Sequence, residues 1–232
     1  QLGSGRSGYH TDTTLLKVEN FVEQVEALKT SLGLKEFYLH GHSWGTALAL
    51  EYYLKYPKGI KAIIFNSPYF STSLWKADAD TLITTLPDSI QLAIKTGEKN
   101  HDYGSPAYKN ANEVFYKNFG VRKTKLTSEL DTSTAKGNEF IYNYMWGPTE
   151  FTAAGTLINY NRVQSLKTIK VPTLFITGEF DEARPVTVKY FQSLVPNSKF
   201  VMIDGAGHGT MHDNKGQNIS AVKTFLDSLE LK

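Results

Sequence analysis

Hydrophobic residues recur along the chain with two different periods. Near its start they follow helical spacing from Leu15 to Leu32, and Gly33 stands where such a helix would end. Four short apolar runs of the kind that form strands buried on both faces come later, at 37–40, 62–65, 173–177 and 200–203. Helical patterns at about 45–56, 186–194 and 218–229 lie between or after these runs. Strands alternating with helices predict an α/β protein with a mostly parallel sheet covered on both faces.

This alternation stops between residues 68 and 169. Polar helical stretches take its place, and an insertion of this length between two strands is usually a lid over a site or a separate domain. We therefore predict a core made of residues 1–67 and 170–232, with a helical cap made of residues 68–169. Most aromatic residues of the cap are expected to build its own core. They are Trp75, Tyr103, Tyr108, Phe115, Tyr116, Phe119, Tyr142, Tyr144 and Trp146.

Composition narrows the function classes. The 232 residues are 41% hydrophobic and 12% aromatic, which suits one or two compact domains. A net charge of +2 with scattered lysines gives no reason to expect a nucleic acid or an anionic membrane as partner. The absence of cysteine excludes disulfides, thiolate metal sites and cysteine nucleophiles. No apolar run is long enough to cross a bilayer and no signal peptide stands at the first residue, so the cytoplasm is the default compartment.

The pentapeptide GHSWG at 41–45 lies directly after a predicted strand and directly before a predicted helix. A GxSxG pattern also occurs by chance in loops. A strand that turns at once into a helix, however, holds the middle residue in a strained, exposed position, and small flanking residues let the two backbones pass closely. We therefore predict that Ser43 is a nucleophile.

A serine hydroxyl needs a base within hydrogen-bond reach, and that base needs an acid to orient it. Asp181 follows the predicted strand 173–177, and His208 follows the predicted strand 200–203. Because the carboxyl ends of parallel strands meet at one edge of a sheet, both side chains are expected near Ser43. The chain order of serine, acid and histidine is also that of α/β-hydrolase sheets.

Other residues compete for these roles. His212 stands four residues after His208, which is the spacing of a metal pair, but the glutamate of HExxH and a convincing helix are missing, so we predict no metal. Glu179 and Glu182 compete with Asp181 as the acid. The charge pattern alone would place these two glutamates on the solvated surface.

A glycine-rich segment at 3–8 satisfies GxGxxG, the fingerprint of dinucleotide binding. The fingerprint should follow a strand and open a helix, and this segment does neither. We predict a turn at the rim of the active site and no cofactor.

Taken together, these motifs resemble the proline iminopeptidase family of α/β-hydrolases, also called prolyl aminopeptidases. The resemblance implies an α/β-hydrolase fold with an inserted helical cap. The matching motifs are QLGSGRS at 1–7, GHSWG at 41–45, WGPTEF at 146–151, GEFDE at 178–182 and GHGTM at 207–211. Several separated motifs in the same order are more specific than GxSxG alone.

The resemblance implies Ser43 as nucleophile, Asp181 as acid and His208 as base, in agreement with the reasoning from the residues. It adds Glu150 and Glu182 as the carboxylates that hold the free α-ammonium group of the substrate. Two carboxylates facing a partly desolvated cleft bind a cation strongly and disfavour blocked ends.

The implied activity is that of a serine aminopeptidase. It would release an N-terminal proline, or a similar small residue, from short peptides with a free N-terminus through an acyl-enzyme. The Trp44 backbone N–H would stabilise the oxyanion. Two alternatives stay open: an esterase or amidase acting on other small acyl groups, and a hydrolase-fold binding module without catalysis.

The sequence departs from the family at its start. An upstream HGGPG-type segment, which carries the second oxyanion donor, and the first strands of the sheet are not among these residues. Four strands with an open edge make a poor domain. We expect a preceding segment of roughly 60 to 80 residues, or a companion chain, to complete the sheet.

Overall fold

A parallel sheet organises the molecule. The computed structural model describes residues 1–9, 11–123 and 135–230. The sheet has the order β1-β2-β3-β4, and each neighbouring pair is parallel. Its strands are β1 (Phe37–His42), β2 (Ile60–Asn66), β3 (Thr173–Gly178) and β4 (Ser198–Ile203). Each contains one of the apolar runs that predicted it and is slightly longer, since the runs were read only as far as the apolar residues.

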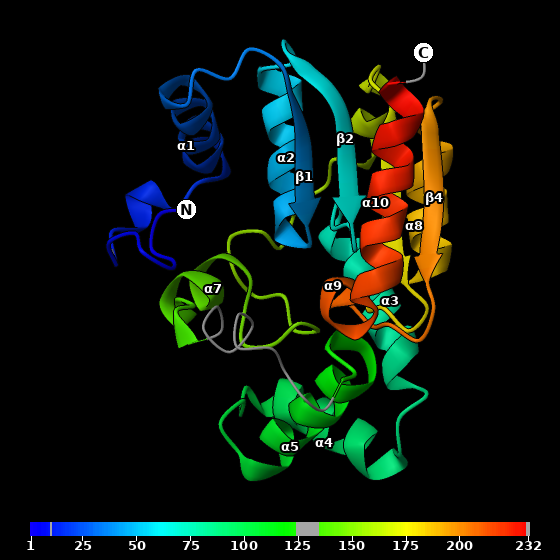
Figure 1. The fold of residues 1–232 in the computed structure, drawn as a ribbon. Helices are drawn as coiled ribbons and strands as arrows, with labels where there is room; N and C mark the ends of the chain where they lie inside the picture. The colour runs from blue at the N-terminus through cyan, green and yellow to red at the C-terminus, as the bar shows by residue number, and fades with distance from the viewer. Residues whose placement is uncertain (10, 124–134, 231–232) are drawn as a thin grey trace.

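Helices cover both faces of this sheet (Figure 1). They are α1 (Val18–Ser31), α2 (Trp44–Lys55), α8 (Pro185–Ser193) and α10 (Lys215–Glu230). Successive residues of a strand point to opposite faces. Ile63 and Phe65 of β2 therefore pack with α1, α2 and α8, while Ala62 and Ile64 join the cluster that contains Phe225 of α10.

The first helix begins later than its apolar pattern predicts. Residues Thr13–Leu15 form a separate 3-10 turn, and the Asp12 carboxylate accepts a hydrogen bond from Thr14 N. A side chain that caps a short turn competes with continuous helix. Leu15 therefore lies outside α1, which starts at Val18.

The segment that the sequence assigns to a cap, residues 68–169, lies between β2 and β3 and is called the cap segment below. Its elements are α3 (Thr72–Ile83), α4 (Asp88–Asn100), α5 (Pro106–Phe115), the π-helix η2 (Tyr116–Gly120), α7 (Glu139–Met145) and the 3-10 helix η3 (Val163–Thr168). Figure 1 shows α4, α5 and α7 beyond the carboxyl ends of the strands. The cap segment therefore lies next to the sheet edge where Ser43, Asp181 and His208 are predicted. Its status as a separate domain stays a prediction.

The aromatic residues of the cap segment do not all build its own core. Tyr108, Phe115 and Phe119 are buried in a cluster of the cap segment itself, as predicted. Trp75 and Trp146 instead pack with the main core. The pattern of aromatic residues could not show this, because it gives no direction for a single ring.

No helix among the residues described is both long enough and apolar enough to span a bilayer.

Candidate active site

Ser43 occupies the sharp turn between β1 and α2. Its backbone angles are φ 53° and ψ −126°, a region that non-glycine residues rarely enter without strain. The backbone around it holds it there. Ser43 N donates to Asn66 O over 3.0 Å, and the Thr46 hydroxyl donates to Ser43 O over 2.7 Å. The elbow that the pentapeptide predicts is therefore present, and neighbouring residues fix it.

Gly41 is the glycine that lets strand and helix pass closely. A Cβ at Gly41 would lie 2.2 Å from the carbonyl oxygen of Gly45 and 2.7 Å from Thr46 N. At Gly45, no atom of the described residues lies within 4 Å of an added Cβ. The steric requirement expected for both flanking glycines is thus found only at Gly41 within the part of the chain that the structure describes.

Asp181 and His208 form a buried hydrogen-bonded pair, with 2.8 Å between Asp181 Oδ1 and His208 Nδ1. Asp181 also accepts hydrogen bonds from Gly178 N, Ala183 N and the Ser67 hydroxyl, the last over 2.6 Å. Burial alone would raise the pKa of Asp181, but the charge of His208 and these hydrogen bonds lower it below its ordinary value. Asp181 is thus an ionised carboxylate suited to orient the imidazole.

Two residues that sequence reasoning missed hold the backbone of His208. Its carbonyl oxygen lies 3.0 Å from the Ser67 hydroxyl, whose single proton points to Asp181, and 2.9 Å from His42 Nε2. The rings of His42 and His208 are 4.8 Å apart. Ser67 had a usable signal, because it directly follows a predicted strand at the same sheet edge as Asp181. For His42, the usable signal was its position next to Ser43 in the pentapeptide.

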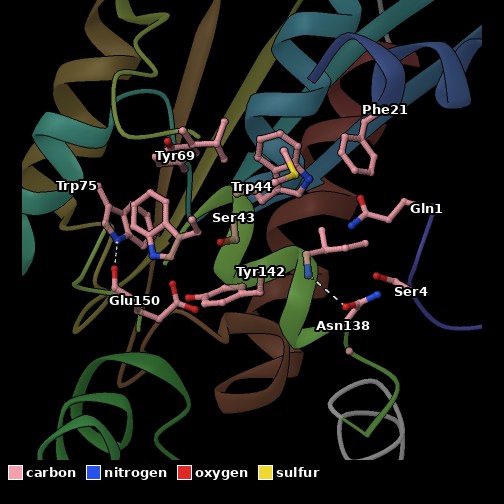
Figure 2. A pocket seen from close by; sticks show the side chains of 15 residues that line it. Gln1, Ser4, Phe21, Ser43, Trp44, Tyr69, Trp75, Asn138, Tyr142 and Glu150 are labelled. Atoms are coloured by element: carbon pink, nitrogen blue, oxygen red, sulfur yellow. Dashed lines mark hydrogen bonds between the residues drawn. The ribbon is translucent and has the colours of Figure 1, made fainter. Parts of the chain in front are cut away.

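Ser43 lines a cavity of about 290 Å³ that Trp44 and Glu150 also line (Figure 2). Gln1 and Ser4 lie at the same cavity, so the turn predicted at the rim of the site is confirmed. Much of the remaining wall is apolar, formed by Phe21, Tyr69, Trp75, Met145, Trp146 and Leu157. Trp44 is the first residue of α2, where a backbone N–H has no partner within the helix and faces a developing negative charge favourably.

The structure brings the loop of His208 to the elbow through His42, but no hydrogen bond joins the Ser43 hydroxyl to the His208 imidazole within the residues described. Catalytic hydrogen bonds are often long in the absence of substrate and tighten during the reaction. Ser43 lines the cavity, whereas His208 is 8% exposed and is not among the lining residues. The arrangement supplies a nucleophile, a base and an acid for acyl transfer.

Glu182, which follows Asp181 directly, is 1% exposed, so the surface position that the charge pattern indicates for it is wrong. Neither of its carboxylate oxygens has a hydrogen-bond partner within the part of the chain that the structure describes, and Oε1 lies 3.8 Å from His208 Nδ1. Burial, followed by the charge of Glu150, raises the pKa of Glu182 well above its ordinary range. Glu179 is the one on the surface, where it accepts from Gly205 N.

Glu150 is half-buried, and its side chain points toward the ring of Tyr142 (Figure 2). Burial and the charge of Glu150 raise the pKa of Tyr142. The Glu150 carbonyl oxygen accepts from Trp75 Nε1 over 2.9 Å. The charges of Glu182 and Glu150 both raise the pKa of His208, and of these two glutamates only Glu150 lines the cavity.

Metal ligation finds no support at His212. Among the residues described, no three His, Asp or Glu side chains could together hold a metal ion. Asp213, the next residue, accepts backbone N–H groups of Gly207, Arg122 and Lys123.

Comparison with known proteins identifies the family of the chain. Residues 1–215 match the family model of the alpha/beta hydrolase fold. A proline iminopeptidase of Heyndrickxia coagulans is 39% identical over 230 residues, covering 99% of this chain and 80% of the relative. A second, from Lactobacillus helveticus (strain DPC 4571), is 34% identical and covers 98% of this chain and 78% of its own.

Two solved structures are similar over nearly the whole chain. Proline iminopeptidase of Mycobacterium smegmatis superposes with a TM-score of 0.91 at 28% identity, covering 100% of this chain and 79% of its own. VinJ superposes with a TM-score of 0.93 at 26% identity, covering 99% and 79%.

Replacing Gly41 with alanine tests the elbow. The new Cβ would collide with backbone atoms, which cannot move away as a flexible side chain could. We expect Gly41→Ala to lower the free energy of unfolding by about 1 to 3 kcal/mol, measured by urea denaturation. Gly216→Ala, at an exposed position of α10 with no neighbour within 4 Å, is the control and should not be destabilised. Equal stability of the two variants would contradict the steric requirement.

The acidic limb of the pH–rate profile tests the charges around His208. Burial alone would lower the pKa of His208, but the charges of Asp181 and Glu182, with further contributions, raise it to about 9. A general base works in its neutral form, so the rate should rise with pH through this value. Because glutamine cannot ionise, Glu182→Gln should lower the pKa of His208 over the pH range in which native Glu182 is ionised and move this limb to lower pH.

The measurement is kcat/KM against pH with a small uncharged ester, so that no substrate charge titrates or binds. Glu179→Gln, a change at an exposed carboxylate of the same turn, is the control and should leave the limb in place. An acidic limb of Glu182→Gln that stays at the native pH would show that Glu182 does not influence the base.

Proposed function

Because this chain belongs to the proline iminopeptidase family of α/β-hydrolases, we propose that it is a serine aminopeptidase. It releases an N-terminal proline, or a similar small residue, from short peptides with a free N-terminus. Ser43 is the nucleophile, His208 the general base and Asp181 the acid that orients it. The observation that carries the proposal is the carboxylate of Glu182, which is buried without a hydrogen-bond partner among the described residues and whose pKa the charge of Glu150 raises further.

An unpartnered buried carboxylate is costly for a folded protein. A second negative charge nearby increases that cost, which is why the pKa of Glu182 is raised. A substrate cation between Glu150 and Glu182 would supply charge-assisted hydrogen bonds to both and relieve this repulsion. The α-ammonium group of a peptide is such a cation, and it lies close to the first carbonyl group. The pair therefore favours attack at the first peptide bond.

The reaction follows from these positions. His208 takes the proton of Ser43 as its oxygen attacks the carbonyl carbon of the first residue. The Trp44 backbone N–H donates to the developing oxyanion at the positive end of α2. His208 then protonates the leaving amine, and water releases the first residue from the acyl-enzyme.

The wall of the cavity favours an apolar first residue. Phe21, Tyr69 and Trp146 line it together with Trp44, and their rings bury apolar surface without offering a partner for a charged side chain. A compact ring such as that of proline meets these faces at low entropic cost because it has few rotatable bonds.

Labelling with a fluorophosphonate and turnover of prolyl amides test the proposal together. We expect the native protein to be labelled and Ser43→Ala to lose both labelling and turnover. A prolyl amide with a free amine should be cleaved, whereas its N-acetylated form should not. Equal turnover of both forms would replace the aminopeptidase with a general esterase or amidase. A native protein that is never labelled would point to a binding module.

Neutralising each carboxylate tests the ammonium site. A lost charge-assisted hydrogen bond costs about 1.5 to 3 kcal/mol, which corresponds to roughly a tenfold to hundredfold loss in kcat/KM. We expect Glu150→Gln and Glu182→Gln to show losses of this size on the free prolyl amide and a much smaller change on an uncharged ester.

The matched control for this pair is Glu139→Gln. Glu139 is an exposed residue in the first turn of α7, so its change removes one charge from the cap segment away from the cavity. This variant should retain native kinetics. Equal losses on the amide and on the ester would contradict a role of Glu150 and Glu182 in binding the ammonium group.

A further inference from the structure

The loop that carries His208 lies directly against the end of the π-helix η2. His208 N donates to Phe119 O over 2.8 Å, and Gly209 N donates to Gly120 O over 2.9 Å. A Cβ at Gly207 would lie 2.6 Å from Gly120 O and 2.7 Å from Phe119 O. Only a residue without a side chain allows this approach, so the base and the cap segment meet backbone to backbone.

The carboxylate of Asp213 joins the same two segments a second time. On the side of the base, it accepts from Gly207 N over 2.9 Å. On the side of the cap segment, it accepts from Arg122 N over 2.9 Å and from Lys123 N over 2.8 Å. Asp213 is 8% exposed, and within the described part of the chain it forms no ion pair with a basic side chain. Its oxygens are therefore engaged by backbone N–H groups.

The backbone N–H of His208 is held by the cap segment, whereas core residues hold its carbonyl oxygen and its ring. Ser67 and His42 contact its carbonyl oxygen, and Asp181 contacts its ring. These three residues lie at the carboxyl ends of strands β1, β2 and β3 of the core sheet, of which β1 leads into the elbow. The ring keeps its distance to Ser43 only if the loop is held on both sides. A displacement of about 1 Å in such a site can cost on the order of a hundredfold in rate.

We propose that Asp213 is a positioning residue of the reaction, which fixes the His208 loop against the turn formed by residues 119–123. The cap segment, which carries Glu150, and the loop of the base are thereby held in one arrangement. Asp213 touches neither substrate nor reacting atoms and acts through His208. The π-helical turn fits this role, because π-helical turns occur frequently at functional sites.

A role confined to folding would have a different signature. It would lower the stability of the protein and leave the chemistry of each folded molecule unchanged. The test therefore needs a rate per competent site. Fluorophosphonate labelling provides it, since its end point counts competent sites and its rate reports how well His208 activates Ser43. The inference depends on the proposed function only for Ser43 as the nucleophile, not for the ammonium site.

Asp213→Asn is the variant to test in the full chain. The amide matches the carboxylate in size, but its NH₂ group faces backbone donors, so at least one of the three N–H groups loses its acceptor. We expect a labelling rate per competent site about tenfold to a hundredfold below native, with kcat reduced similarly and KM for a prolyl amide nearly unchanged. Gly207→Ala should act in the same direction, because its Cβ pushes the two segments apart.

Asp204→Asn is the matched control. Asp204 is an exposed carboxylate four residues before His208, and it accepts from Gln217. It should keep the native rate. A folded Asp213→Asn variant that is labelled at the native rate would overturn the inference. A variant whose only change is a raised KM would overturn it as well. A native protein that is not labelled would instead refute Ser43 as nucleophile, so the two failures are distinguishable.

Discussion

The hydrogen bond between Asp181 and His208 is the interaction on which the rest of the site depends. Asp181 is buried, and hydrogen bonds from the backbone and from Ser67 keep it ionised. Its charge in turn raises the pKa of the imidazole and fixes which ring nitrogen faces away from it. Removing one partner of a buried pair leaves an uncompensated charge, at a cost of about 3 to 5 kcal/mol. Both the fold and the chemistry therefore depend on this pair.

The surroundings shift the pKa values of two adjacent residues, Asp181 and Glu182, in opposite directions. Both are buried, but hydrogen bonds satisfy Asp181, whereas the carboxylate of Glu182 has none among the described residues and is subject to the charge of Glu150. The pKa of the first is lowered and that of the second is raised. Opposed environments of this kind separate the roles of neighbouring carboxylates. One is hydrogen-bonded to His208, and the other is the carboxylate that we propose for the ammonium site.

The sequence predicts best where the signal is local. The strands, the elbow at Ser43 and the loops of Asp181 and His208 follow from apolar runs, a short motif and the geometry of parallel sheets. Glu150 came only from the resemblance, because no periodicity distinguishes it from an exposed residue. Asp213 could not be recognised at all, since its role depends on backbone groups about 90 residues away. Burial of Glu182 likewise depends on tertiary contacts that a charge pattern does not contain.

The cap segment and the core share one packed interior at the cavity. Tyr69, at the start of the cap segment, is buried in one cluster with Phe65 of β2, and its ring lies edge-on to Trp75 at 5.7 Å and to Trp146 at 5.4 Å. Trp75 also lies 5.5 Å from the ring of His208 and donates to the carbonyl oxygen of Glu150. Close-packed interiors transmit a displacement instead of absorbing it. A shift of the cap segment would therefore move the aromatic wall, the Glu150 carboxylate that we propose for substrate binding, and the surroundings of His208 together. In the proposed mechanism, substrate recognition is thereby coupled to catalysis.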